Sequence, residues 1–230
     1  MKRKNVVLNR PVFAQQVFDS RSLTVLTTLF HRFPEAGDYD LTIWRDERMV
    51  HRAHVRVSME GGPLQLHLDL AALEGIRESY LLASGGVIGF CVSRGIGRYR
   101  VEIVQLTHQE KIVRLDSGHV IPEGDLFAVT LVRPGIYRVL QVGGRGEGEI
   151  HVRLPGKERY RPDQVTRVMV GKEGVMEPRV VEILAGQSVV FWCTIPASLR
   201  VEWVKAMEAL EPPIQRPQLT RRQPRQPAQK

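Results

Sequence analysis

Seven histidines and two cysteines are the residues of this chain best suited to bind a transition metal or to act in nucleophilic catalysis. His51 and His54, in the segment HRAH, lie three residues apart in a stretch that alternates like a β-strand. Successive strand side chains point to opposite faces, so these two imidazoles are predicted to face apart and not to chelate one ion. The other histidines are scattered singly, at His31, His67, His108, His119 and His151. The sequence therefore predicts no metal and no other cofactor.

The two cysteines offer no sign of an activated nucleophile. Cys91 follows a phenylalanine among glycines, and Cys193 ends the apolar run Val189–Cys193. A catalytic thiol needs a base within hydrogen-bonding reach, and neither cysteine has a histidine nearby in the sequence. Both are predicted to be small core residues. Two cysteines about a hundred residues apart also argue against a disulfide framework and favour a reducing compartment, the cytoplasm, although one bridge between distant strands stays open.

Two further patterns have simple structural explanations. The segment GGRGEG at 143–148 resembles a phosphate-binding loop, but it lies between two predicted strands and lacks the Gly-Lys-Ser/Thr ending, so it is predicted to be a hairpin tip. Paired carboxylates occur only at predicted turns, at Asp38/Asp40 and Asp46/Glu47, where solvation accounts for them. We therefore predict no catalytic residue and no enzyme.

The elements that would position any site are strands. Polar and apolar residues alternate along 39–43, 55–57 and 64–70, and again in short segments from Tyr99 to Trp203 that are separated by Gly, Pro and Asp turns. Residues 71–82 break this pattern with apolar residues at helical spacing, so a short helix is expected there, and a second helical turn is expected at 203–211. The fold class predicted is all-β, with two antiparallel β-sandwich domains and one or two short helices.

We expect five segments along the chain. They are a basic N-terminal arm (1–20), a first β-sandwich domain (21–84), a Gly-rich connector (85–97) that would alternatively be a buried strand with bulges, a second β-sandwich domain (98–205) and a basic Pro/Gln-rich tail (206–230). The pattern Gly-x-Tyr followed by two strands and His-Val-Arg occurs in both halves, at Gly37 and His54 and again at Gly135 and His151. Either a duplication or the common chemistry of β-hairpins explains it.

The charge of the chain is concentrated at its ends. The net charge is +8, but residues 1–10 and 212–230 hold nine of the 33 basic residues and no acid, so the remainder has a net charge of −1. Such segments bind anionic surfaces, nucleic acid or acidic protein grooves, or merely solubilise a protein. The predicted partner-binding residues are Lys2, Arg3, Lys4, Arg10, Arg216, Arg221, Arg222, Arg225 and Lys230. The sequence shows no apolar run long enough for a secretory signal or a transmembrane span.

The second half resembles the cupredoxin-like β-sandwich over residues 98–203. Residues 176–191, with a proline-led strand, a Gly turn and a buried strand, are similar to the opening hairpin of that family. Residues 121–137, with a Pro-Gly turn before a tyrosine-bearing strand, are similar to its closing hairpin, although the two occur here in reversed order. The resemblance implies the sheet of that family but not its copper, because no histidine follows Phe191 closely and the cysteine position falls on Gln141. The ligand loop, 142–148, likewise contains no sulfur and no imidazole.

These observations predict a non-catalytic structural or accessory subunit of a larger assembly. It would bind a protein partner or further copies of itself through sheet surfaces and basic termini. One alternative is a ligand-binding module, most simply for carbohydrate, that uses Trp44, Trp192 or Trp203 as a stacking platform. Another is a metal-free relative of a copper protein with an enzymatic or redox-accessory role.

Overall fold

The computed structural model describes residues 10–73, 75–107, 109–156, 161 and 163–206, and most of its regular structure is β-strand. Alternation in the sequence becomes alternation in burial: in β8 (Tyr99–Leu106) every second side chain is buried and its neighbours are partly exposed. The described helical structure is short, comprising α1 (Arg10–Ala14) and one 3-10 turn (Lys172–Gly174). The all-β prediction is confirmed.

After the short N-terminal strand β1 (Val17–Asp19), the described part of the first half of the chain contributes eight strands and that of the second half another eight. The first-half strands are β2 (Thr27–Arg32), β3 (Gly37–Arg45), β4 (Arg48–Ser58), β5 (Gln65–Asp69), β6 (Gly75–Ala83), β7 (Val87–Cys91), β8 and β9 (Lys111–Asp116). The second-half strands are β10 (Leu126–Thr130), β11 (Gly135–Gln141), β12 (Glu147–Arg153), β13 (Val165–Val170), β14 (Met176–Glu177), β15 (Val180–Leu184), β16 (Ser188–Cys193) and β17 (Leu199–Lys205).

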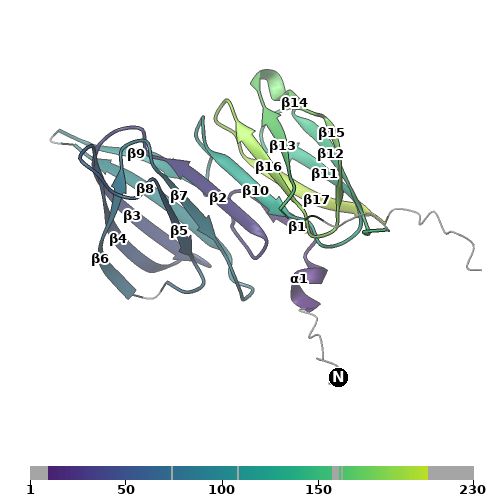
Figure 1. Cartoon of the computed structure of the whole chain (residues 1–230), viewed down its shortest axis with the longest axis horizontal. Helices are drawn as coiled ribbons and strands as arrows, with labels where there is room; N and C mark the ends of the chain where they lie inside the picture. The colour runs from purple at the N-terminus through teal and green to yellow at the C-terminus, as the bar shows by residue number, and fades with distance from the viewer. Residues whose placement is uncertain (1–9, 74, 108, 157–160, 162, 207–230) are drawn as a thin grey trace, which may run out of the picture.

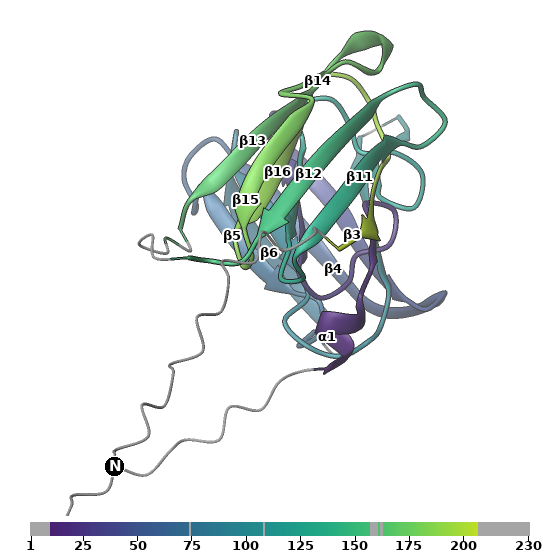
Figure 2. The same ribbon diagram turned by 90° about the vertical axis from the view of Figure 1, so that its right-hand side faces the viewer.

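These strands form three sheets. The central sheet has the order β14-β13-β16-β10-β2-β7-β5, so the antiparallel pairing of β2 with β10 joins the two halves into one sheet. We call this pairing the seam. The first-half sheet has the order β6-β4-β3-β8-β9, and the second-half sheet has the order β1-β17-β11-β12-β15, where β1 is Val17–Asp19. Figure 1 shows β2 and β10 side by side in the middle of the molecule, and in Figure 2 the second half lies in front of the first.

Both five-stranded sheets lie on the same face of the central sheet. One row of directly paired residues crosses six strands of that sheet on this face: Val168, Phe191, Phe127, Leu29, Phe90 and Leu68. All six side chains are buried in the hydrophobic core, which they share with inward-facing residues of the other two sheets. We call this the inner row, and the opposite side of the sheet the outer face.

The two halves repeat one strand order. In each half, the second strand of a hairpin (β3–β4 or β11–β12) pairs in parallel with a later strand (β6 or β15). A strand still later in the chain (β8 or β17) pairs antiparallel with the first strand of the hairpin. Gly37 and Gly135 have φ of +150° and +148°, a region that favours glycine. The hydroxyls of Tyr39 and Tyr137 each donate a hydrogen bond of 2.8 Å to the carbonyl four residues earlier.

The Gly-x-Tyr pattern therefore occupies equivalent positions in the two halves, but the His-Val-Arg match does not. Gly37 pairs with Val57 and Gly135 pairs with Val152, so Val57 and Val152 correspond. By this register, the residue that corresponds to His54 is Glu149, two positions before His151. The sequence match is two residues out of register.

The prediction of a helix at 71–82 is wrong, because β6 begins at Gly75 and pairs in parallel with β4. Of the helical turn expected at 203–211, residues 203–205 belong to β17 and residues from 207 onward lie outside the described part of the chain. Four of the strand pairings are parallel, so the sheets are mixed and not purely antiparallel.

The expected connector at 85–97 contains β7, a strand of the central sheet. The strands that follow it, β8 and β9, pair with β3 and with each other in the first-half sheet. The segment is therefore not a boundary between sheets, and the chain passes into the second half only between β9 and β10. The N-terminal arm also contributes to the fold, because β1 pairs with β17.

Candidate functional site

The outer face of the central sheet carries a second apolar row that no described element covers. Across six strands this outer row consists of Met169, Trp192, Leu126, Phe30, Gly89 and His67. Trp192 is 49% exposed, whereas the inner-row residue beside it, Phe191, is 0% exposed. The rings of Phe30 and His67 meet edge to face at 6.4 Å, on either side of Gly89, whose lack of a side chain leaves room for both.

The local sequence explains why this face is apolar. Strands β10 (LFAVT) and β16 (SVVFWC) carry apolar residues at both odd and even positions, so each presents apolar side chains to both faces of the sheet. Such continuous runs are typical of strands that are buried on both sides. Here one side packs against the core and the other is open.

A second outer row, next to the first, is mixed in character. It consists of Arg167, Val190, Ala128, Thr28, Cys91 and Asp69. Its centre is apolar or small, and its two ends, on β13 and β5, carry opposite charges. Polar groups therefore border an apolar centre, which is the arrangement of a protein-binding surface.

The outward faces of the two five-stranded sheets differ from this surface. Ion pairs cover them, such as Arg52–Asp40 and Arg56–Asp38 on the first-half sheet and Arg138–Glu202 and Arg153–Glu182 on the second-half sheet. Among the ion pairs of the described residues, none lies on the outer face of the central sheet. The outward faces of the two five-stranded sheets thus combine ion pairs with single exposed apolar residues such as Val113 and Val180, whereas the outer face of the central sheet carries a row of adjacent apolar residues.

The three tryptophans proposed as a stacking platform lie in different places. The guanidinium of Arg100 lies 5.2 Å from the ring centre of Trp44, and that of Arg133 lies 3.8 Å from that of Trp203. The indole N–H of Trp203 also donates to the carbonyl of Pro134 at 3.3 Å. Trp192 is on the outer face, among apolar neighbours. The structure therefore does not bring the three rings together.

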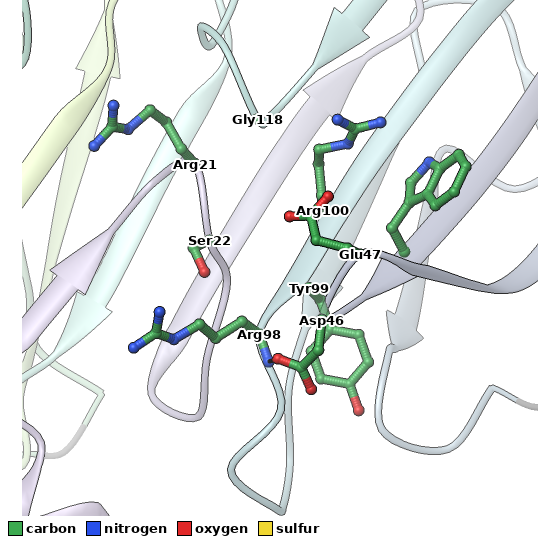
Figure 3. Close-up of a pocket in the computed structure, with 9 residues that line it drawn as sticks. Arg21, Ser22, Asp46, Glu47, Arg98, Tyr99, Arg100 and Gly118 are labelled. Atoms are coloured by element: carbon green, nitrogen blue, oxygen red, sulfur yellow. Dashed lines mark hydrogen bonds between the residues drawn. The ribbon is translucent and has the colours of Figure 1, made fainter.

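A polar cavity of about 420 Å³ lies beside Trp44 (Figure 3). It is lined by Arg21, Ser22, Trp44, Asp46, Glu47, Arg98, Tyr99, Arg100 and Gly118. Arg21 is held by Asp19 through two hydrogen bonds of 2.7 and 3.0 Å, so its charge is already balanced. The Nε1 atom of Trp44 is buried and finds no acceptor among the described residues. The mixture of guanidinium and carboxylate groups suits a small polar ligand better than a simple anion.

A second cavity, of about 310 Å³, lies at one end of the seam. Its lining includes His31 and Asp125, whose side chains are 6% and 3% exposed and 2.6 Å apart. A histidine–carboxylate pair is a component of many general-base sites. Among the residues that line this cavity there is no serine, threonine, cysteine or lysine to be activated. The pair joins the two halves of the chain, and the thiol near it, that of Cys193, is buried in the core and does not line the cavity.

The prediction that His51 and His54 face apart is confirmed, because His51 is buried and His54 is partly exposed. In the described ranges, no group of three metal-binding side chains occurs. Both cysteines are free. Cys193 is fully buried, and burial, with the nearby Asp125 carboxylate, raises the pKa of its thiol to about 12. The prediction of a core position is wrong for Cys91, which lies partly exposed in the second outer row.

The remaining candidate residues fall mostly beyond the described part of the chain. Lys2, Arg3, Lys4, Arg216, Arg221, Arg222, Arg225 and Lys230 lie outside it, and Arg10 begins α1. Residues 143–146 of the segment 143–148 lie between β11 and β12, as predicted for a hairpin tip, and residues 147 and 148 begin β12. Sequence reasoning missed the outer row, whose signal was the run of apolar residues at consecutive positions.

Within the described ranges, no helix has both the length and the apolar composition that crossing a membrane requires. In comparisons with known proteins, no family model, no curated protein and no solved structure matches this chain.

Proposed function

We propose that this protein is a non-catalytic structural or accessory subunit that binds a protein partner through the outer face of the central sheet. The observation that carries the proposal is the contrast between the three outward sheet faces. Ion pairs line two of them, and an apolar row with a half-exposed tryptophan crosses the third. Burying apolar surface of this kind in an interface is favourable by roughly 25 cal/mol for each Å² removed from water.

A protein fits this surface better than a sugar does. A carbohydrate site needs hydrogen-bonding side chains around its aromatic ring, whereas the residues paired beside Trp192 are Met169 and Leu126. The row also crosses six strands, roughly 24 Å at about 4.8 Å per strand interval, which suits a second sheet or a helix. Buried aromatic residues at the centre of a protein interface supply most of its binding energy.

We also propose the finer points of the architecture and location. Each half is taken as a β-sandwich, and the second as a cupredoxin-like one without copper. Pro178 before β15, Gly186 with φ of +92° in the following turn, and the Pro134-Gly135 turn before Tyr137 support this resemblance. The basic residues at 2–10 and 216–230 are proposed to strengthen binding by pairing with acidic groups of the partner. Two free cysteines support a reducing compartment, the cytoplasm.

One observation favours a second function. The buried, unpaired indole N–H of Trp44 beside the polar cavity is a group that a bound polar ligand, such as a sugar hydroxyl, would satisfy. In that case Trp44→Phe would weaken binding of the ligand and leave protein assembly unchanged.

The test of the main proposal compares two lysine substitutions at equally exposed apolar positions. Trp192 lies on the outer face and Val180 on the second-half sheet, and both are 49% exposed. Wild type, Trp192→Lys and Val180→Lys are expressed in the source cell, and the native mass of each isolated protein is measured. We expect the assembly to be lost in Trp192→Lys and kept in Val180→Lys. Unchanged assembly of a folded Trp192→Lys protein contradicts the proposal.

A further inference from the structure

We propose that the partner on the outer face is a second copy of this chain, related to the first by a two-fold axis that runs along the seam. This inference rests on the proposed function and names its partner. It would place two central sheets face to face, with strands of the two copies roughly aligned. Sheets pack in this way at about 10 Å, and their strand directions stay within about 30° of each other.

Charge complementarity selects both the partner and the axis. The second outer row has Arg167 on β13 at one end and Asp69 on β5 at the other. A two-fold axis parallel to the strands at the seam reverses the order of the strands in the second copy. It therefore sets β13 of one copy against β5 of the other. Arg167 then faces Asp69 of the partner subunit, and the same contact occurs twice.

The other in-plane axis does not give this match. An axis at right angles to the strands leaves the strand order unchanged, so β13 would face β13 of the second copy. That strand, VTRVMV, contains Arg167 and no acid, and two arginines would approach each other. Like charges set against each other at an interface are strongly unfavourable.

Both charged groups are available for such a contact. No ion pair joins Arg167 or Asp69 to another described residue. Asp69 accepts hydrogen bonds from the side chain and N–H of Ser93 and from the N–H of Ala71. Burial would raise the pKa of its carboxyl, but these hydrogen bonds, together with the positive charge of nearby Arg94, outweigh burial and hold the pKa below its usual value. The carboxylate is therefore fixed in place and charged at neutral pH.

The same axis brings aromatic and aliphatic side chains together at the centre. It places β16 against β7, so the ring of Trp192 faces the rings of Phe30 and His67 of the partner subunit, which lie over Gly89 of the partner subunit. It places β10 against β2, so Leu126 faces Phe30 of the partner subunit. Aromatic and aliphatic groups then meet at the centre, and the ion pairs lie at the rim, as in stable interfaces.

The experiment is a charge exchange on the purified full-length chain, measured by sedimentation velocity over a concentration series. In Arg167→Asp, acids face each other at both rim contacts, and in Asp69→Arg, arginines do. We expect each variant alone to dimerise at least about tenfold more weakly than wild type. An equimolar mixture of the two variants restores opposite charges at both contacts, so a heterodimer of near wild-type affinity is expected. Arg153→Asp, on the second-half sheet, is the matched control and should dimerise like wild type.

The outcomes separate this inference from the proposed function. A wild-type chain that stays monomeric in this series overturns the second copy as partner. If Trp192→Lys nevertheless abolishes the assembly isolated from the source, the outer face is still the binding surface, and its partner is a different protein. The axis along the seam is overturned if both charge variants dimerise as tightly as wild type. It is also overturned if mixing the two variants does not restore dimerisation. Circular dichroism and chemical unfolding of each variant show whether it is folded. If Asp69→Arg disturbs the local structure that the hydrogen bonds from Ser93 hold, the Arg167→Asp variant still tests the contact between Arg167 and Asp69 of the partner subunit.

Discussion

The imidazole Nδ1 of His31 lies 2.6 Å from the carboxylate Oδ2 of Asp125, just beyond the last paired residues of the seam. The other carboxylate oxygen accepts a hydrogen bond of 3.1 Å from the backbone N–H of Arg32. The two residues are 94 positions apart in the sequence and come from different halves. A buried polar pair in this position fixes the register in which the halves join, because a slip would leave both groups unpaired.

We expect Asp125→Ala to lower the free energy of unfolding by about 3 kcal/mol, because it leaves the buried His31 side chain and the backbone N–H of Arg32 without their acceptor. Chemical denaturation measures this change. Asp163→Ala, at an exposed turn, is the control and should change stability by less than about 0.5 kcal/mol. The double variant His31→Leu/Asp125→Ala should recover part of the loss, since it removes both polar groups. Equal stability of Asp125→Ala and wild type would show that the pair does not hold the seam.

Tyr39 and Tyr137 allow the repeated architecture to be tested directly. Each hydroxyl makes the same hydrogen bond, so Tyr39→Phe and Tyr137→Phe should each cost about 1 kcal/mol at neutral pH. The sites lie in different halves, so the two losses should add in the double variant. Chemical denaturation of the single and double variants measures this. A loss at only one site would mean that the two corners are not equivalent.

Tyr137 also predicts a dependence on alkaline pH. Burial raises the pKa of its phenol to about 12, above the ordinary value of 10.0. The unfolded chain therefore loses this proton first, so the stability that the protonated phenol contributes is present below pH 10 and is lost between about pH 10 and 12. Tyr137→Phe removes this contribution. The stability difference between wild type and Tyr137→Phe should shrink over that range, and a constant difference would contradict the buried phenol.

The cysteines predict a difference in reactivity towards iodoacetamide. The thiolate is the reactive form, and burial raises the pKa of Cys193 to about 12, while Cys91 is partly exposed with a smaller rise that also comes mainly from burial. Labelling of the folded monomer at pH 8, followed by peptide mass spectrometry, should modify Cys91 first and leave Cys193 unmodified until the chain unfolds. Raising the pH should speed labelling at Cys91. Modification of Cys193 at the rate of Cys91 would contradict its position in the core.

Local alternation predicted most of the strands, because a strand with one buried face repeats every two residues whatever its partners are. The prediction failed at 71–82, where apolar residues fit a helical spacing as well. Near the end of that segment Tyr80 and Leu82 are buried and Leu81 is exposed, which is a strand pattern imposed by pairing with β4. Propensity is weak beside such a tertiary contact.

The candidate site was harder to predict from sequence than the strands. Apolar runs such as SVVFWC indicate strands with two apolar faces, but they do not say which face lies against the core. That depends on the pairing of β2 with β10, which joins residues about a hundred positions apart and which no local pattern encodes. The outer row exists only after the halves have joined.

Hydroxyl-radical footprinting of Trp192 tests the central claim most directly, because oxidation of a tryptophan ring reports its exposure to water. The protein is footprinted as isolated from its source at native concentration and again after dilution to the single chain, with Trp44 as the internal reference. We expect oxidation of Trp192 to be several-fold slower in the undiluted sample and oxidation of Trp44 to be unchanged. Equal oxidation of Trp192 in the two samples would mean that nothing covers the outer face.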